Sequence, residues 1–282
     1  MTESPPKPSR LSASTDWLRG YWRDHPKRSL ETFGRQITMG IQAIAQLFGD
    51  LFRGKFPFGE FIKQCAFMAN VSALPTLVVA IPLGVVISVQ VGSLVGQLGA
   101  TSFMGAAIGL GIIRQGAPLV TTLMISGAVG SAICADLGSR TIREEIDAMK
   151  VMGVDPMRRL VAPRLAAAML VSVLLCGFVV FVGFLATYMF FIFAQSGTPG
   201  SFIGTFAAFA VANDLIVALL KSLIFGLLCA IIACDLGLNA KGGPGGVANA
   251  VNAAVVQSAL LLFGMNVIIT QIYNTLFPSQ AV

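Results

Sequence analysis

The stretch LAAAMLVSVLLCGFVVFVGFLATYMFFIFA, residues 165–194, contains no charged side chain. An α-helix of about 20 apolar residues crosses the hydrocarbon core of a bilayer, so this stretch is long enough to span one. The whole chain of 282 residues is 55% hydrophobic and 11% charged, with a mean hydropathy of +0.80. Soluble domains carry about 25% charged residues. The chain is therefore predicted to be an all-α polytopic membrane protein.

Four more stretches have the same character, so the sequence predicts five transmembrane helices in total. Their expected bounds are about 68–94, 103–135, 163–194, 213–236 and 252–277. Pro75 and Pro82 are expected to break the first helix, and Asn213–Asp214 is expected to cap the fourth. A short apolar helix is expected between the third and fourth spans. The sequence NAKGGPGG, residues 239–246, predicts a tight glycine loop before the fifth.

Ahead of these spans, a helix is predicted over residues 30–52. Its apolar residues recur every three or four positions along one face: Leu30, Phe33, Ile37, Ile41, Ile44, Phe48 and Leu51. Basic residues at its end, Arg53 and Lys55, favour a helix that lies in the membrane interface. A helix packed on the rest of the protein is the alternative.

The expected organisation has three parts: a disordered basic cytoplasmic tail over 1–29, an interfacial helix region over 30–66, and a membrane domain over 67–282. The tail has no apolar segment typical of a secretory signal. Ten of the 19 lysines and arginines lie at or before Lys63, and six lie between Arg140 and Arg164. The positive-inside rule therefore places the N-terminus and residues 136–164 and 237–251 in the cytoplasm, with the C-terminus outside. We expect the chain in the cytoplasmic (inner) membrane.

The charged segment EEIDAMKVMGVDPMRR, residues 144–159, interrupts this apolar chain between spans two and three. Thr141 and Glu144 have capping-box spacing, which predicts a helix from about Ile142 with Ile142, Ile146, Met149 and Met152 on one face. Arg143 and Asp147 are spaced to pair. Gly153 is expected to end the helix, and Asp155–Pro156 to start the next. The segment is either a solvated loop helix or a docking surface for a cytoplasmic partner.

The sequence holds no catalytic or metal-binding constellation. His25 is its only histidine, and the five cysteines form no CxxC pair. Cys65, Cys134, Cys176, Cys229 and Cys234 are expected to be small buried hydrophobic residues. No G-x-x-x-x-G-K-[ST] sequence occurs, so the chain lacks this way of holding ATP phosphates.

The stretch GSAICADLGSRTIREEIDAMKVMGVDPMRRLVAPR, residues 130–164, resembles the signature of the MlaE/YrbE permease family. Matching positions include Gly130-Ser131-Ala132, Leu137-Gly138, Glu145-Ile146-Asp147-Ala148, Val154-Asp155-Pro156 and Pro163-Arg164. ETFGR in the first helix and LLKSLIFG in span four are also similar to the family. The chain resembles actinobacterial YrbE-like subunits more than proteobacterial ones.

This resemblance implies the membrane permease subunit of an ABC-type lipid transporter that works with MCE proteins. The cargo would be a fatty acid, phospholipid or sterol, held between two permease subunits. Residues 136–158 would contain a coupling helix that docks on a cytoplasmic ATPase, which binds ATP and Mg; this chain would bind no cofactor itself. The expected coupling residues are Glu145, Ile146, Asp147, Met149, Met152, Val154 and Asp155, with Ile146, Met149 and Val154 as buried docking contacts.

The chain departs from the family pattern in span two. Where members commonly have Arg-Glu-Leu-Gly-Pro, it has Arg114-Gln115-Gly116-Ala117-Pro118, so Arg114 is expected to lack its nearest counter-charge. An arginine within a span costs about 2.5–3.5 kcal/mol on insertion scales and normally faces a partner or a wet cavity. Arg114 either pairs with a carbonyl or another subunit's carboxylate, or binds a lipid headgroup. Arg114, Gln115 and Gln90 are the lipid-binding candidates, and a non-identical YrbE paralogue is the expected source of the missing carboxylate.

Two other functions stay open at the level of sequence. A non-transporting membrane scaffold for MCE proteins would keep the docking helix without a lipid path. An ATPase-independent secondary transporter would need intramembrane carboxylates or inverted repeats. Asp136, Asp214 and Asp235 all lie near the ends of predicted spans.

Overall fold

The computed structural model of the chain describes residues 31–50, 54, 56–195 and 197–276, and every regular element among them is helical. Five helical stretches in this part are long and apolar enough to cross a membrane: Phe58–Gln97, Met104–Ile142, Met157–Gln195, Ala212–Leu238 and Gly243–Leu276. The predicted all-α fold with five transmembrane helices is confirmed. Each stretch extends beyond its predicted bounds at one end or at both, because the helix continues past the apolar segment.

The spans are built from α2 (Phe58–Gln97), α3 (Met104–Gly111), α4 (Ala117–Met124), α5 (Gly130–Ile142), α7 (Ala162–Gln195), α9 (Ala212–Leu238) and α10 (Gly243–Leu276). Two short helices lie between spans, α6 (Glu145–Val151) and α8 (Pro199–Phe209). Short π-helical segments, η2 (Ile112–Gly116) and η3 (Ile125–Val129), join the parts of the second span, and η4 (Met157–Val161) leads into α7. The predicted short apolar helix between spans three and four is α8.

Residues 31–50 form a helix, which confirms the predicted first helix where it is described. Phe33, Ile37, Ile41 and Phe48 of its predicted apolar face are all exposed. Leu30, Leu51, Arg53, Lys55 and the tail 1–29 lie outside the described residues. The chain divides into two compact units, the first ending at Gln42 and the second beginning at Ala43. The boundaries at 29 and 66 stay a prediction.

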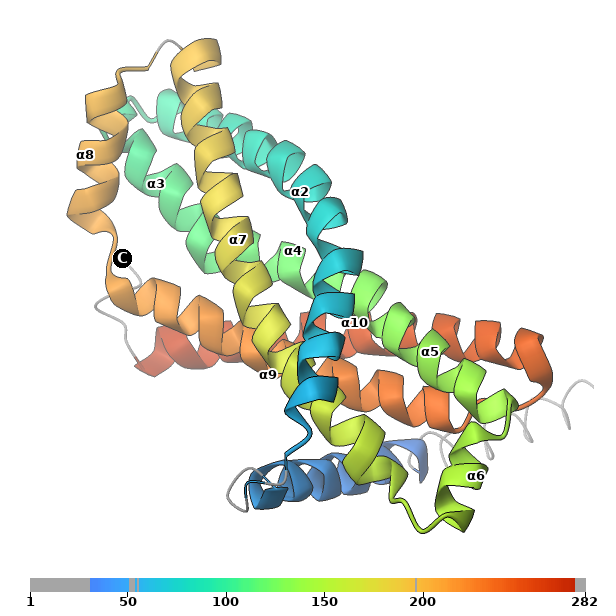
Figure 1. Cartoon of the computed structure of the whole chain (residues 1–282). Helices are drawn as coiled ribbons and strands as arrows, with labels where there is room; N and C mark the ends of the chain where they lie inside the picture. The colour runs from blue at the N-terminus through green and yellow to red at the C-terminus, as the bar shows by residue number, and fades with distance from the viewer. Residues whose placement is uncertain (1–30, 51–53, 55, 196, 277–282) are drawn as a thin grey trace, which may run out of the picture. The chain divides into compact units, whose positions relative to one another are not determined.

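Within the second unit, α7 is the central helix and lies against α2 and α9 (Figure 1). Helices α5, α9 and α10 pack on one another, and α8 packs on α3. Helices α6 and α8 lie at opposite ends of α7 (Figure 1). Helix α9 begins beside the middle of α7, because Cys176, about midway along α7, contacts Ala218 in the first two turns of α9.

Helix α2 continues through Pro75 and Pro82 as one 40-residue element, so the predicted break is wrong. Each proline removes a backbone hydrogen bond and favours a bend, and α2 is visibly curved in Figure 1. Packing along α7 keeps the helix continuous. The predicted glycine loop is also shorter than expected, because α10 already begins at Gly243 and includes Pro244, Gly245 and Gly246.

Glycines set the closest helix contacts. A side chain at Gly105 of α3 would collide with the Phe202 carbonyl of α8, and one at Gly109 would meet the Phe206 ring. At Gly226 of α9 a side chain would collide with Ser172 of α7. Small residues allow membrane helices to approach closely, and the Gly105-x-x-x-Gly109 spacing serves this purpose between α3 and α8.

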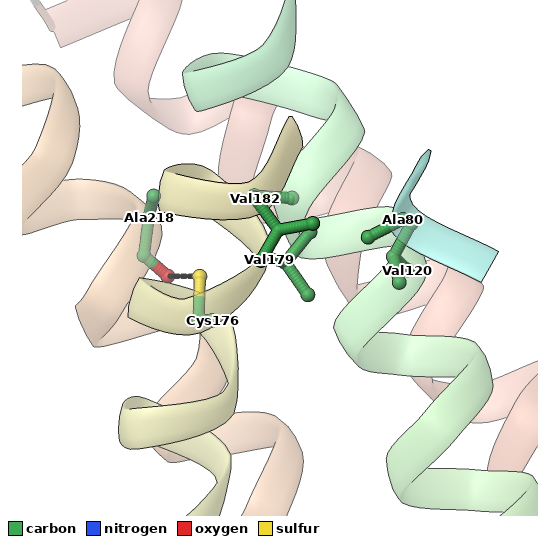
Figure 2. Packing of buried hydrophobic residues seen from close by; sticks show 7 residues of the cluster. Ala80, Val120, Cys176, Val179, Val182 and Ala218 are labelled. Atoms are coloured by element: carbon green, nitrogen blue, oxygen red, sulfur yellow. Dashed lines mark hydrogen bonds between the residues drawn. The ribbon is translucent and has the colours of Figure 1, made fainter. Parts of the chain in front are cut away.

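The apolar core joins α7 to three other spans, through residues of α2, α4 and α9. Ala80, Ala117, Val120, Cys176, Val179, Val182 and Ala218 form one buried cluster, and Figure 2 shows how its side chains meet. The thiol of Cys176 lies 3.7 Å from the Ala218 carbonyl oxygen. Cys134, Cys176, Cys229 and Cys234 are buried, as predicted, while Cys65 is half-buried.

Candidate functional site

The predicted coupling helix exists as α6, but it begins differently from the prediction. Thr141 lies inside α5, where its hydroxyl donates to the carbonyls of Leu137 and Gly237, so it does not cap α6. Helix α5 continues to Ile142. Glu144 then takes a left-handed conformation with a φ of 61°, which turns the chain into α6. The capping box is therefore wrong, because α5 continues about two turns further than the apolar pattern indicated.

The charged side chains of α6 pair locally. Arg143 lies 3.0 Å from Glu145, and Lys150 lies 2.8 Å from Asp147, so the predicted Arg143–Asp147 pair is wrong. All four side chains are more than 40% exposed. Exposed pairs of this kind contribute about 0–1 kcal/mol, so they leave α6 charged on its solvent face without fixing its position.

Helix α6 ends as predicted at Gly153. The Gly153 amide donates to the Lys150 carbonyl at 3.0 Å, and the Val154 amide donates to the Met149 carbonyl at 2.9 Å. This pair of bonds is a Schellman motif, which favours glycine in the left-handed conformation; Gly153 has a φ of 74°. Asp155 then accepts a hydrogen bond from the Met157 amide at 3.0 Å, which confirms it as a cap for the next helix.

The predicted docking face is only partly available. Ile146 is 5% exposed within this chain, so its side chain is already covered without any partner. Met149 is half-buried. Val151, Met152 and Val154 are 89%, 70% and 38% exposed. The apolar surface of this segment therefore lies at the C-terminal end of α6, one turn further along than expected.

Two contacts fix the end of the segment that carries α6. Two of the guanidinium nitrogens of Arg158, Nε and Nη2, each donate to the Asp50 carboxylate at 2.5 Å. Gln46 donates to Asp155 at 3.1 Å. Bidentate arginine–carboxylate pairs fix geometry as well as charge. Residues 155–158 are therefore held by the C-terminal end of the helix over residues 31–50.

An ion pair between a buried arginine and a half-buried aspartate lies at the base of the same segment. Arg164 of α7 is 0% exposed, and its guanidinium donates to the Asp136 carboxylate of α5 and to the Leu160 carbonyl. Arg140 adds a second contact to Asp136 at 3.3 Å. Asp136 precedes residues 143–156 in the chain and Arg164 follows them. The pair therefore joins α5 and α7, the two helices that α6 connects.

Within the membrane-length helices, Arg114 and Asp214 form an ion pair between η2 and α9. Nε of Arg114 lies 2.9 Å from Oδ1 of Asp214, and Nη2 donates to Oδ2 at 3.1 Å. The expectation that Arg114 lacks a counter-charge in this chain is wrong. The expected Asn213–Asp214 cap is also wrong, since the cap residue of α9 is Val211 and no side chain caps it.

The ion pair borders a cavity of about 240 Å³. Its polar lining comes from three spans and comprises Arg114, Gln115, Asp214, Lys221, Thr270, Tyr273 and Asn274. Lys221 is 3% exposed, and its ammonium group lies 2.8 Å from the Thr270 hydroxyl. The lining therefore holds two cationic groups and one carboxylate. The remaining lining residues are Leu110, Gly111, Val217 and Ala218.

Arg114 owes its position to the π-helical segment η2. The extra residue per turn in a π-helix rotates the following side chains, and such segments are frequent at functional sites. Arg114 is 30% exposed on its side chain and Asp214 only 1%. The arginine thus faces the cavity, while the carboxylate lies behind it.

The lipid-binding candidates are not all brought together. Arg114 and Gln115 line the cavity, but Gln90 lies on the exposed side of α2 and is not part of its lining. Sequence reasoning missed Lys221, Thr270 and Tyr273. A lysine inside a span was the available signal for Lys221, whereas Thr270 and Tyr273 are ordinary residues of a helix end.

Five membrane-length helices, three of which line a charged cavity, and a short surface helix that connects the second and third of them define a polytopic membrane permease. The chain belongs to the MlaE permease family, because the family described as Permease MlaE matches residues 61–272.

Individual relatives agree with this assignment. A probable ABC transporter permease protein of Synechocystis sp. is 30% identical over 240 residues, which cover 85% of this chain and 91% of the relative. A probable ABC transporter permease protein of Rickettsia bellii is 25% identical over 87% of this chain and 93% of its own length. The chloroplast protein TRIGALACTOSYLDIACYLGLYCEROL 1 of Arabidopsis thaliana is 28% identical over 76% of this chain and 61% of its own length. The chain is therefore similar to transporter subunits rather than to enzymes.

Proposed function

We propose that this chain is the permease subunit of an ATP-driven lipid transporter that works with MCE proteins. The observation that carries the proposal is the cavity beside Arg114, which combines two cationic side chains with apolar walls inside a bundle of membrane-length helices. An amphiphile with an acidic headgroup and an acyl chain matches both kinds of lining. One relative also bears the name of a lipid, trigalactosyldiacylglycerol.

The proposed engine is a cytoplasmic ATPase that binds ATP and Mg and docks on α6. The exposed side chains Val151, Met152 and Val154 form an apolar patch that suits a groove on a partner protein. Glu145, Asp147 and Asp155 are the proposed polar contacts at its edge. Ile146 and Met149 support the patch from beneath, since Ile146 is covered by the chain itself.

Closure of the ATPase on ATP would act on the spans through the base of α6. The Asp136–Arg164 pair joins α5 to α7, so a force on α6 reaches both helices together. ATP drives transport only if it favours one permease conformation over another.

The proposed assembly contains a second permease subunit, a non-identical YrbE paralogue, with MCE proteins on the extracytoplasmic side. Asp214 already supplies a carboxylate to Arg114, so the paralogue is not needed for that charge. The proposed membrane is the cytoplasmic (inner) membrane. Mass spectrometry of the tagged complex tests the composition: a single permease species contradicts the heterodimer.

The docking and transport proposal is tested on the complex purified from its native membrane. ATP hydrolysis should rise when anionic lipid is added. Met152→Asp should lose both the copurifying ATPase and the lipid-stimulated hydrolysis, while the permease stays monodisperse. Leu98→Asp is the matched control, because Leu98 is 80% exposed and lies outside α6.

Two results contradict the proposal in different ways. An ATPase that copurifies but ignores lipid would favour the non-transporting scaffold. Lipid transport that persists after Met152→Asp has removed the ATPase would favour an ATPase-independent secondary transporter.

A further inference from the structure

We propose that Asp214 is an exchangeable counter-ion: the acidic headgroup of the cargo displaces its carboxylate from Arg114, so the cavity selects anionic amphiphiles over neutral ones. This inference rests on the proposed function and adds a specificity-determining residue to it. The ligand class is a carboxylate or phosphate carried on an acyl chain.

The charge balance of the cavity favours a ligand with one negative charge. Arg114 and Lys221 contribute two positive charges, and Asp214 contributes one negative charge. Lys221 is held by the neutral Thr270 hydroxyl, and no carboxylate pairs with it among the described residues. One negative charge on the ligand therefore balances the site. Unbalanced charge is costly at membrane depth, so a neutral ligand leaves this cost in place.

The Arg114 and Asp214 side chains differ in how accessible they are from the cavity. The Arg114 side chain is 30% exposed, and the Asp214 side chain is 1% exposed. Both residues line the cavity, but the guanidinium offers a ligand much more accessible surface than the carboxylate does. Planar guanidinium groups bind carboxylate and phosphate oxygens in pairs, and Asp214 at present occupies this kind of contact through Nε and Nη2. The ligand and Asp214 thus compete for the same donors.

The Asp214 carboxylate keeps favourable surroundings after a ligand displaces it from Arg114. The Tyr273 hydroxyl lies 3.5 Å from Asp214 Oδ1, close enough to tighten into a hydrogen bond. Asp214 also lies in the first turn of α9, where the helix dipole stabilises a negative charge. The carboxylate can therefore leave Arg114 without being stranded.

The exchange has a mechanical consequence. The Arg114–Asp214 pair joins η2 in the second span to α9 in the fourth, 100 residues apart in the chain. An anion on Arg114 removes this link, so cargo binding favours a conformation in which the two spans separate. A ligand shifts a conformational equilibrium only through such a difference in contacts.

The experiment measures ligand binding by the intact complex in phosphatidylcholine nanodiscs, with empty nanodiscs as the blank. The probes are oleate, oleyl alcohol with nearly the same chain and no charge, and acetate with the charge and no chain. Wild type should bind oleate more tightly than oleyl alcohol. Asp214→Asn should lower the Kd for oleate at least tenfold and leave oleyl alcohol unchanged. Arg114→Gln should abolish the preference between the two.

Asp235→Asn is the matched control, because Asp235 is a buried carboxylate at the other end of α9 and outside the cavity lining. It should leave the oleate Kd unchanged. The double variant R114D/D214R tests the same idea if Asp214→Asn does not fold. It keeps an ion pair between the same helices but moves the cation to the covered position, so the oleate preference should disappear.

Several outcomes would overturn the inference. Folded Asp214→Asn protein that binds oleate no more tightly than wild type would show that the two anions do not compete. Retained oleate preference in R114D/D214R would do the same. Acetate that displaces oleate at equal concentration would show a site for free anions rather than lipid. Wild type that binds no oleate and shows no oleate-stimulated ATP hydrolysis would instead contradict the proposed lipid transport.

Discussion

At the scale of single residues, most charged side chains of the membrane-length helices are paired. Asp136 pairs with Arg164 and Arg140, and Asp214 pairs with Arg114. Arg164 is covered completely, so its charge depends on Asp136 and on the Leu160 carbonyl. Removing one member of a buried pair leaves an uncompensated charge. These pairs therefore hold particular helices together.

The Asp136–Arg164 pair gives a prediction at this scale. Asp136→Ala should destabilise the folded permease by about 3–5 kcal/mol, because Arg164 would remain buried without a carboxylate. Asp136→Glu, which keeps a carboxylate opposite Arg164, should keep most of the stability. Denaturant unfolding of the purified protein measures the free energy. Asp147→Ala removes the exposed Lys150 pair and should change it by less than about 1 kcal/mol.

At the scale of helices, close packing rests on glycine. Helix α9 approaches α7 at Gly226, where a methyl group would collide with Ser172 Oγ and the Ala168 carbonyl oxygen. Gly177, on α7 itself, faces open space with nothing within 4 Å. The same substitution should therefore have opposite effects at these two positions, although both are glycines inside spans.

Gly226→Ala should destabilise the fold by about 1–3 kcal/mol, because the two helices must move apart or distort. Gly177→Ala should be neutral or stabilise by up to about 1 kcal/mol, since alanine is the better helix former. Thermal unfolding of both variants in the same detergent tests the contrast. Equal effects would show that the α7–α9 contact is looser than described.

At the scale of the whole molecule, the distribution of basic residues predicts the orientation in the membrane. The connection that carries α6 is rich in arginine, whereas the connection between α2 and α3 has no basic residue. Short loops rich in lysine and arginine stay in the cytoplasm. Helix α6 should therefore face the cytoplasm and Leu98 the outside.

Single-cysteine variants test this orientation, in a background where the five native cysteines are replaced. In spheroplasts, a membrane-impermeant maleimide should label Leu98→Cys directly. It should label Met152→Cys only after the membrane is permeabilised. Both positions are strongly exposed in the chain, so accessibility within the protein does not separate them. The reverse pattern would place α6 outside the cell and contradict its docking on a cytoplasmic ATPase.

Features that depend on neighbouring residues could be predicted from the amino-acid sequence alone. Hydropathy predicted the five spans, Gly153 predicted the end of α6, and Asp155 predicted the start of the next helix. These signals succeed because a helix and its ends depend on residues within a few positions. The same signals misplaced the start of α6. Helix α5 continues through polar and charged residues, which a hydropathy pattern does not assign to a membrane span.

Which charged side chains pair and which apolar residues are buried could be seen only from the packing of the helices. Asp214 lies 100 positions from Arg114, and hydropathy does not say which spans lie side by side when all their faces are apolar. For the same reason, Ile146 was predicted as a docking contact but is buried in its own chain. Long-range pairing follows from helix packing, and close approach at residues such as Gly226 sets that packing.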